Sequence, residues 1–239
     1  MSAADSPRPI LSHLEELRWR LVRTAAGIAV AAGISLVFAG RIKTVLEVPY
    51  RRACESCLFQ TLNATEQFSV LMRIALFGGL ILASPVVLYQ VWAFINPALT
   101  NRERKWVVPI VASCALLFTG GVVFGYWTLP RGLSFLLNIF EDVRTDLRML
   151  DYFTFAMRFM LMFGLSFLYP VFLFVAAAMG VVSAEQLARG RRWALLIIVI
   201  VAAAITPTGD ALTLTFLSVP LYVLYEATYW LVRLTLHKK

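Results

Sequence analysis

The sequence predicts an all-α polytopic membrane protein with six transmembrane helices. Of its 239 residues, 60% are hydrophobic and only 15% are charged, whereas a soluble domain is nearer half apolar and a quarter charged. The apolar residues come in blocks of membrane-spanning length rather than as a periodic face. We therefore expect one membrane domain, residues 1–239, with spans at about 22–40, 68–96, 106–129, 152–178, 193–206 and 212–235.

The distribution of the +8 net charge predicts the orientation of these spans. With the spans placed as above, 13 Lys and Arg residues fall on the side of the two termini and seven in the loops of the opposite side. Loops rich in Lys and Arg stay in the cytoplasm. Both termini are therefore expected on the cytoplasmic side, and the positive charge does not indicate a nucleic-acid partner.

A helix at the membrane interface is expected before the first span. Ser12-His-Leu-Glu15 matches a capping box with Ser12 as the N-cap, and the mixture of Leu, Trp and charged residues after it suits an interfacial helix. With Glu15 used in the cap, Glu16 is the acid left to bind a ligand. The simpler alternative, which physical reasoning favours, is an ion pair between Glu16 and Arg20 four residues on.

The first outer loop, residues 41–67, is too long for a bare connector, so we expect it to form a structured cap that includes Pro49. Cys54 and Cys57 form a C-x-x-C in this loop. In an oxidising compartment they could form a local disulfide or stay as a thiol pair. A redox-active site is less favoured, because no thioredoxin-like βαβ pattern surrounds them.

Spans two and three carry residues with a structural meaning. Pro85 is expected to kink span two, and Arg73, near its outer end, is expected to reach the interface with its charged head. Span three contains Gly120, Gly121 and Gly125, small residues that permit close contact between helices.

The loop between these two spans contains one acid, Glu103, among three basic residues. Thr100 and Glu103 match a capping box at the start of span three, where the helix dipole also favours a negative charge. The same position would hold a carboxylate at the membrane surface for a cationic ligand, and guanidinium groups bind carboxylates through paired hydrogen bonds. The two interpretations are compatible, and the residues alone do not decide between them.

The last two spans are unusually short or interrupted. Residues 193–205 would form only about 20 Å of helix against a hydrocarbon core of about 30 Å. Such a hairpin must thin the bilayer or be covered by neighbouring subunits. Span six contains Glu226, and an acid inside a span is a functional candidate that usually has a partner. Arg233, two turns further along, is the partner expected for it.

With these features, the chain resembles the TatC family, the multi-spanning core subunits of the twin-arginine protein translocase. The resemblance runs along nearly the whole chain. The motifs that carry it are His13-Leu-Glu-Glu-Leu-Arg-Trp-Arg20, Ser84-Pro-Val-Val-Leu-Tyr-Gln-Val-Trp-Ala-Phe-Ile-Asn-Pro-Ala-Leu99, Arg102-Glu-Arg104 and Thr206-Pro-Thr-Gly-Asp210.

The resemblance implies a receptor for twin-arginine signal peptides in the cytoplasmic (inner) membrane of a prokaryote. It implies export of folded proteins driven by the protonmotive force, with single-span partner subunits of the TatA and TatB type on spans five and six and with self-association of this subunit within the complex. It implies no enzyme activity, cofactor or metal. Glu103 would be the chief acid of the binding site, with Glu16, Arg18 and Phe94 beside it. The other functional candidates are Pro49, Pro85, Asp210 and Glu226.

Two departures from the family pattern concern polar residues within the spans. Leu168 stands where many members have a glutamate in span four, and residues 213–215 replace a glutamine early in span six. The alternative function from another class is a small-solute transporter or channel, for which the spans offer few polar groups besides Glu226. An intramembrane enzyme comes third, because no Ser/His pair or metal-ligand cluster occurs within the spans.

Overall fold

The computed structural model describes residues 10–54, 57–95, 107–137, 147–205 and 211–236, and within these ranges the regular structure is helical. The helices are α1 (Ile10–Val37), α2 (Ala39–Ala53), α3 (Thr65–Ile95), α4 (Val107–Leu137), α5 (Met149–Ser166), α6 (Tyr169–Ala178), α7 (Ala184–Arg189), α8 (Arg191–Ile205) and α9 (Ala211–Leu236).

Four stretches are long and apolar enough to cross a membrane: Leu14–Val37, Thr65–Phe94, Val108–Phe135 and Met149–Ala178. They coincide with the first four expected spans, although α4 continues eight residues past the expected end at 129. The short helix expected next is present as α8, whose 15 residues cover roughly 22 Å. The expectation that the sixth span is short or interrupted was wrong, because α9 continues through Pro220 for 26 residues, roughly 39 Å. The all-helical membrane architecture is thus confirmed at the level of these four spans.

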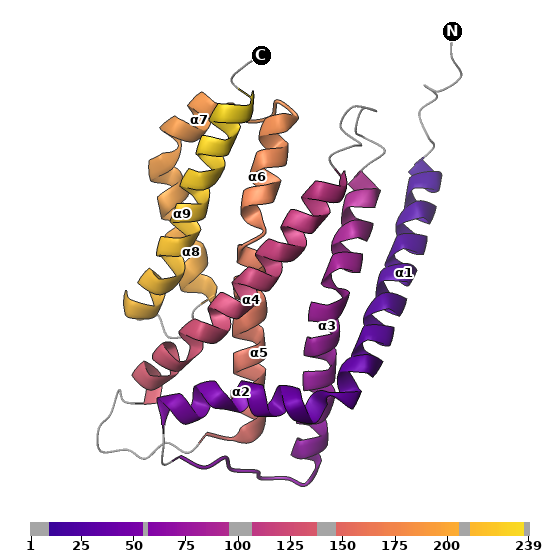
Figure 1. Cartoon of the computed structure of the whole chain (residues 1–239), viewed down its shortest axis with the longest axis vertical. Coiled ribbons are helices and arrows are strands. Elements are labelled where there is room, and N and C mark those ends of the chain that lie inside the picture. The colour runs from indigo at the N-terminus through magenta and orange to yellow at the C-terminus, as the bar shows by residue number, and fades with distance from the viewer. Residues whose placement is uncertain (1–9, 55–56, 96–106, 138–146, 206–210, 237–239) are drawn as a thin grey trace.

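The long helices stand side by side, and α2 lies across one end of them (Figure 1). We call this the α2 end; it also carries the starts of α3 and α5 and the last turn of α4. At the opposite end, which we call the α7 end, lie the first turn of α1, the last turns of α3 and α9, the first turn of α4, and α7 (Figure 1). The first and last described helices therefore have their outer termini at the same end of the molecule.

The N-terminal expectation was wrong in one respect. Helix α1 begins at Ile10 and runs without a break to Val37, so Ser12 lies inside the helix rather than at its N-cap. No Pro or Gly occurs between residues 10 and 26 to end the helix. Leu14 and Trp19 are more than half exposed, as apolar side chains are on a helix that faces lipid or a partner.

Two prolines affect the long helices differently. Helix α3 continues through Pro85, which removes the amide that would bond the Ile81 carbonyl. The Ser84 hydroxyl donates to that carbonyl at 2.7 Å instead. The fourth expected span is broken between α5 and α6 at Phe167 and Leu168, shortly before Pro170, and the buried Leu168 side chain packs in the core.

Glycine lets two pairs of helices approach closely, α1 with α3 and α4 with α5. A Cβ atom on Gly79 of α3 would lie 2.5 Å from the Cα atom of Ala32 in α1. A Cβ atom on Gly121 of α4 would lie 2.9 Å from the Cα atom of Gly164 in α5, and Gly125 packs against the same helix. The expectation for Gly120 was wrong, because nothing lies within 4 Å of its Cβ position.

Candidate functional site

The α7 end carries an ion pair within α1, and the arginine of this pair also contacts α3. The Arg20 guanidinium donates to the Glu16 carboxylate, with distances of 2.5 and 3.1 Å to Oε1. A third nitrogen of Arg20 lies 3.4 Å from the side-chain oxygen of Gln90 in α3. The expected i, i+4 pair is confirmed, and the inference that Glu16 is left without a partner was wrong. Glu16 is a half-buried carboxylate whose charge is already compensated.

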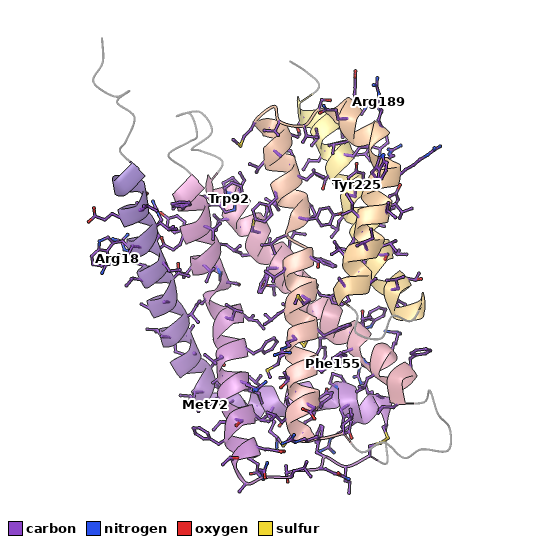
Figure 2. The ribbon with its side chains drawn as sticks, turned by 180° about the vertical axis from the view of Figure 1, so that it is seen from behind. Arg18, Met72, Trp92, Phe155, Arg189 and Tyr225 are labelled. Carbon is purple, nitrogen blue, oxygen red and sulfur yellow. A yellow bond between two sulfur atoms is a disulfide. The ribbon has the colours of Figure 1, made fainter. Side chains whose placement is uncertain are left out.

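Two further predicted site residues lie near this pair. Arg18 is exposed on α1, and Phe94 is half-buried near the end of α3. Trp92, one of the largest fully buried side chains, anchors the end of α3 by stacking on Phe172 of α6 with ring centroids 6.2 Å apart. Figure 2 shows Arg18 and Trp92 on neighbouring helices near the α7 end. The structure thus brings Glu16, Arg18 and Phe94 to one end of the bundle.

The main acid predicted for this site, Glu103, lies outside the described residues, as does Asp210. Helix α3 ends at Ile95 and α4 begins at Val107, both at the α7 end (Figure 1). The chemistry of the described part of this end is that of an ion-pairing surface with exposed apolar side chains on α1. Within the described ranges, no three His, Cys, Asp or Glu side chains are grouped to hold a metal ion.

The α2 end forms the structured cap that the loop length predicted. Pro49 is buried within α2 and cannot donate to the carbonyl of Val45 four residues earlier. The Tyr126 hydroxyl of α4 donates to that carbonyl at 2.9 Å, and the Tyr152 hydroxyl of α5 donates to the next carbonyl, Leu46, at 2.6 Å. Two tyrosines therefore fix α2 across the ends of α4 and α5.

The chain after α2 is also fixed. Cys54 and Cys57 form a disulfide, which decides between the two alternatives left by the sequence. Beyond it, the Gln60 amide donates to the carbonyl of Leu147 at 3.2 Å, and the Met149 amide donates to the carbonyl of Gln60 at 2.9 Å. This short parallel bridge holds the cap against the segment that leads into α5.

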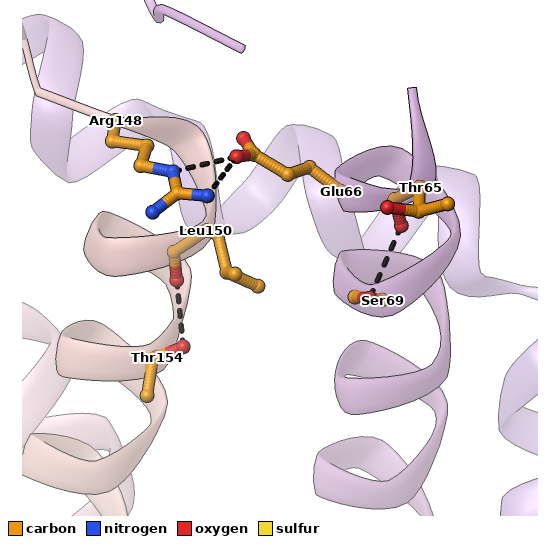
Figure 3. A network of polar contacts seen from close by, with 6 residues as sticks. All are labelled: Thr65, Glu66, Ser69, Arg148, Leu150 and Thr154. Carbon is orange, nitrogen blue, oxygen red and sulfur yellow. Dashed lines mark hydrogen bonds and ion pairs between the residues drawn. The ribbon is translucent and has the colours of Figure 1, made fainter. Parts of the chain in front are cut away.

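An ion pair that the sequence did not predict joins α3 to the residue before α5 at the α2 end. Glu66, the second residue of α3, is 3% exposed, and its Oε1 atom accepts two hydrogen bonds from the guanidinium of Arg148, one from Nε at 2.6 Å and one from Nη2 (Figure 3). The bonded carboxylate raises the pKa of the Arg148 guanidinium above its usual value. The two residues are 82 positions apart, and no local spacing could have indicated their contact.

Glu226 has a different partner from the one expected. Arg191, at the start of α8, donates to Oε2 of Glu226 at 2.8 Å, and the Tyr222 hydroxyl donates to Oε1 at 3.1 Å. Arg233 instead donates to the hydroxyl of Tyr229, one turn before it. Arg191 reaches Glu226 because α8 and α9 pack as an antiparallel hairpin. The prediction that Glu226 has a basic partner is confirmed, and the identity of that partner was wrong.

The sequence of the whole molecule matches a known family. The family model described as "Sec-independent protein translocase protein (TatC)" matches residues 12–220. A protein of this name from Aquifex aeolicus is 35% identical over 97% of both chains. A chloroplastic protein of this name from Arabidopsis thaliana is 36% identical over 97% of this chain and 68% of its own. Two crystal structures described as the twin arginine translocase receptor TatC match with TM-scores of 0.76 and 0.78. They are 35% and 34% identical, and cover 93% and 92% of this chain and 98% of each solved chain.

Proposed function

This chain belongs to the TatC family of Sec-independent protein translocase proteins, and on that basis we propose that it is a receptor for twin-arginine signal peptides. In this role it is also the multi-spanning core of a translocase that exports folded proteins, driven by the protonmotive force. The observation that carries the proposal is the likeness to solved structures described as the twin arginine translocase receptor, which extends over nearly the full length of both chains.

The proposed topology has six spans in the cytoplasmic membrane of a prokaryote, with α8 and α9 as spans five and six and the α7 end in the cytoplasm. The charge distribution supports this orientation, because the loops, the termini and the adjoining helix turns of that end hold 13 of the Lys and Arg residues. The disulfide at the opposite end supports it too, because disulfides persist in oxidising compartments. Single-span subunits of the TatA and TatB type would cover the hairpin that the short α8 forms with α9.

The proposed binding site for the two arginines of the signal is at the α7 end. Glu103 is its chief acid, Glu16 is its second acid, and Arg18 and Phe94 border it. Because Glu16 is already bonded to Arg20, an arginine of the signal competes with Arg20 for this carboxylate. Glu103 is therefore expected to supply most of the binding energy, and lysine is expected to substitute poorly because it cannot form the forked pairing.

The proposal is tested by binding of a signal peptide with Arg-Arg, and of its Lys-Lys counterpart, to the purified protein in detergent. We expect a clear preference for Arg-Arg that is lost in Glu103→Ala. The matched control is Glu185→Gln, which removes one exposed acid of α7 at the same end and should leave the preference intact. Equal binding of the two peptides by the parent protein would refute the receptor function.

The alternative of a small-solute transporter or channel is not favoured, since the relatives that match are named as protein translocase components. Solute flux through liposomes that contain this chain alone would support that alternative. Pro85, Asp210 and Glu226 stay as further functional candidates of the receptor.

A further inference from the structure

Two arginines within the apolar helices share one groove between α3 and α5. Arg73 of α3 and Arg158 of α5 both line a hollow of about 220 Å³, and both side chains are exposed. The Arg73 guanidinium donates to Oγ1 of Thr154 at 2.7 Å, so it points across the groove towards α5. Among the described residues, neither arginine forms an ion pair with a carboxylate.

The two arginines lie at nearly the same depth in the membrane. Arg73 is eight residues from the first residue of α3 and Arg158 nine from that of α5, which is roughly 12–14 Å of helix in each case. With 31 residues, α3 is roughly 46 Å long, so each of its ends extends about 8 Å beyond a hydrocarbon core of about 30 Å. From this depth an arginine side chain reaches the headgroup level of the leaflet at the α2 end.

The groove becomes apolar towards the middle of the membrane. Leu76 and Leu80 follow Arg73 on the same face of α3, and Leu161 follows Arg158 on α5. Phe77 and Met157, which also line the hollow, are buried. The groove is thus cationic near the α2 end and lined by aliphatic side chains deeper in the membrane. A phospholipid in that leaflet matches this order, because its anionic phosphate lies near the surface and its acyl chains lie deeper.

We propose that this groove binds an anionic phospholipid, with its phosphate between Arg73 and Arg158 and an acyl chain along the leucines. Guanidinium groups pair with phosphate oxygens through two parallel hydrogen bonds, and a charge inside a span is costly unless it has such a partner. The nearest acid of α5, Asp151, lies beside Arg148, whose pKa it helps to raise. The hollow is an open groove between two helices, and part of an acyl chain can lie along its leucines with the phosphate at the arginines.

The test is retention of lipid by the purified full-length protein, measured by native mass spectrometry after incubation with phosphatidylglycerol or with phosphatidylcholine. We expect the parent protein to retain phosphatidylglycerol preferentially. In the double variant Arg73→Gln, Arg158→Gln, retention should fall about tenfold, and each single variant should fall about threefold. Arg131→Gln is the matched control, because Arg131 is an exposed arginine near the α2 end of α4 that stacks on Trp127 outside the groove.

A second variant keeps the test decisive if the glutamine variant does not fold. Arg73→Lys, Arg158→Lys retains both charges and should still prefer phosphatidylglycerol, with retention between those of the parent and the glutamine variant. Equal retention of phosphatidylglycerol by the parent and by every folded groove variant would refute the proposal. A second outcome would also refute the proposal: a groove variant that retains the lipid but no longer co-purifies with a single-span partner. In that case the two arginines would bind an acidic residue of that partner instead of a lipid phosphate.

Discussion

The carboxylate of Glu66 accepts two hydrogen bonds from the guanidinium of Arg148, and this pair joins the first turn of α3 to the residue that precedes α5 (Figure 3). Glu66 is almost fully buried, whereas the Arg148 side chain is one-third exposed. The pair is therefore asymmetric, because only the arginine can turn to water when its partner is removed.

This asymmetry predicts unequal effects of the two single substitutions. Arg148→Gln leaves a buried carboxylate without its partner and should lower the Tm in detergent by roughly 5–10 °C. Glu66→Gln should lower it less, and the double variant should be more stable than Arg148→Gln alone. Thermal unfolding followed by tryptophan fluorescence measures all three. Equal and additive losses would contradict a direct coupling of the two residues.

The contact between Tyr126 and the Val45 carbonyl yields a second prediction. The Val45 carbonyl has no donor within the helix, because Pro49 lacks an amide hydrogen. Tyr126→Phe removes the hydroxyl that bonds this carbonyl instead, so we expect a loss of about 1–2 kcal/mol in the free energy of unfolding. In a Pro49→Ala background the restored amide can bond Val45, and the same substitution should then cost less. A cost that is unchanged by Pro49→Ala would refute this account of the proline.

The features that the sequence predicted depend on residues that are close together along the chain, and the features that it missed depend on residues that are far apart. Span positions, the short α8, the cap and the Glu16–Arg20 pair depend on apolar length, loop length or a four-residue spacing, and all of these are local. The Glu66–Arg148 and Arg191–Glu226 pairs join residues 82 and 35 positions apart, and only the packing of helices brings them together. The error at Ser12 has another cause: a capping motif does not start a helix when the residues before it are helical too.

The close approach of α1 and α3 at Gly79 yields a third prediction. Gly79→Ala places a Cβ atom 2.5 Å from the Ala32 backbone, so the helices must separate, at a cost of about 1–3 kcal/mol. Gly120→Ala is the control, since its Cβ position is open and alanine favours a helix by up to about 1 kcal/mol. The free energy of unfolding in detergent should be lowest for Gly79→Ala, and lower than those of the parent and of Gly120→Ala. A neutral Gly79→Ala would show that α1 can shift freely.

The disulfide yields a prediction that separates the two ends of the molecule. Cys54→Ser, Cys57→Ser removes a cross-link of a short loop, which should cost about 2 kcal/mol. Binding of a signal peptide to the site proposed at the α7 end should stay unchanged. A maleimide reagent should modify two cysteines after reduction and none before, because Cys114 is fully buried. Modification of the unreduced native protein at Cys54 or Cys57 would contradict the disulfide.

The compensated charge of Glu16 predicts that the two acids of the proposed site are unequal. Glu103→Gln should weaken binding of an Arg-Arg peptide by roughly 10–100-fold, which is the loss in affinity expected when a hydrogen bond to a charged group is removed. Glu16→Gln should weaken it only by about 2–5-fold, because Arg20 already shares that carboxylate. Arg20→Gln removes the competitor, so the peptide should bind more tightly to this variant than to the parent. Titration of a fluorescent signal peptide into each purified variant measures the three values. Weaker binding by Arg20→Gln would mean that Arg20 holds Glu16 in place for the signal instead of competing with it.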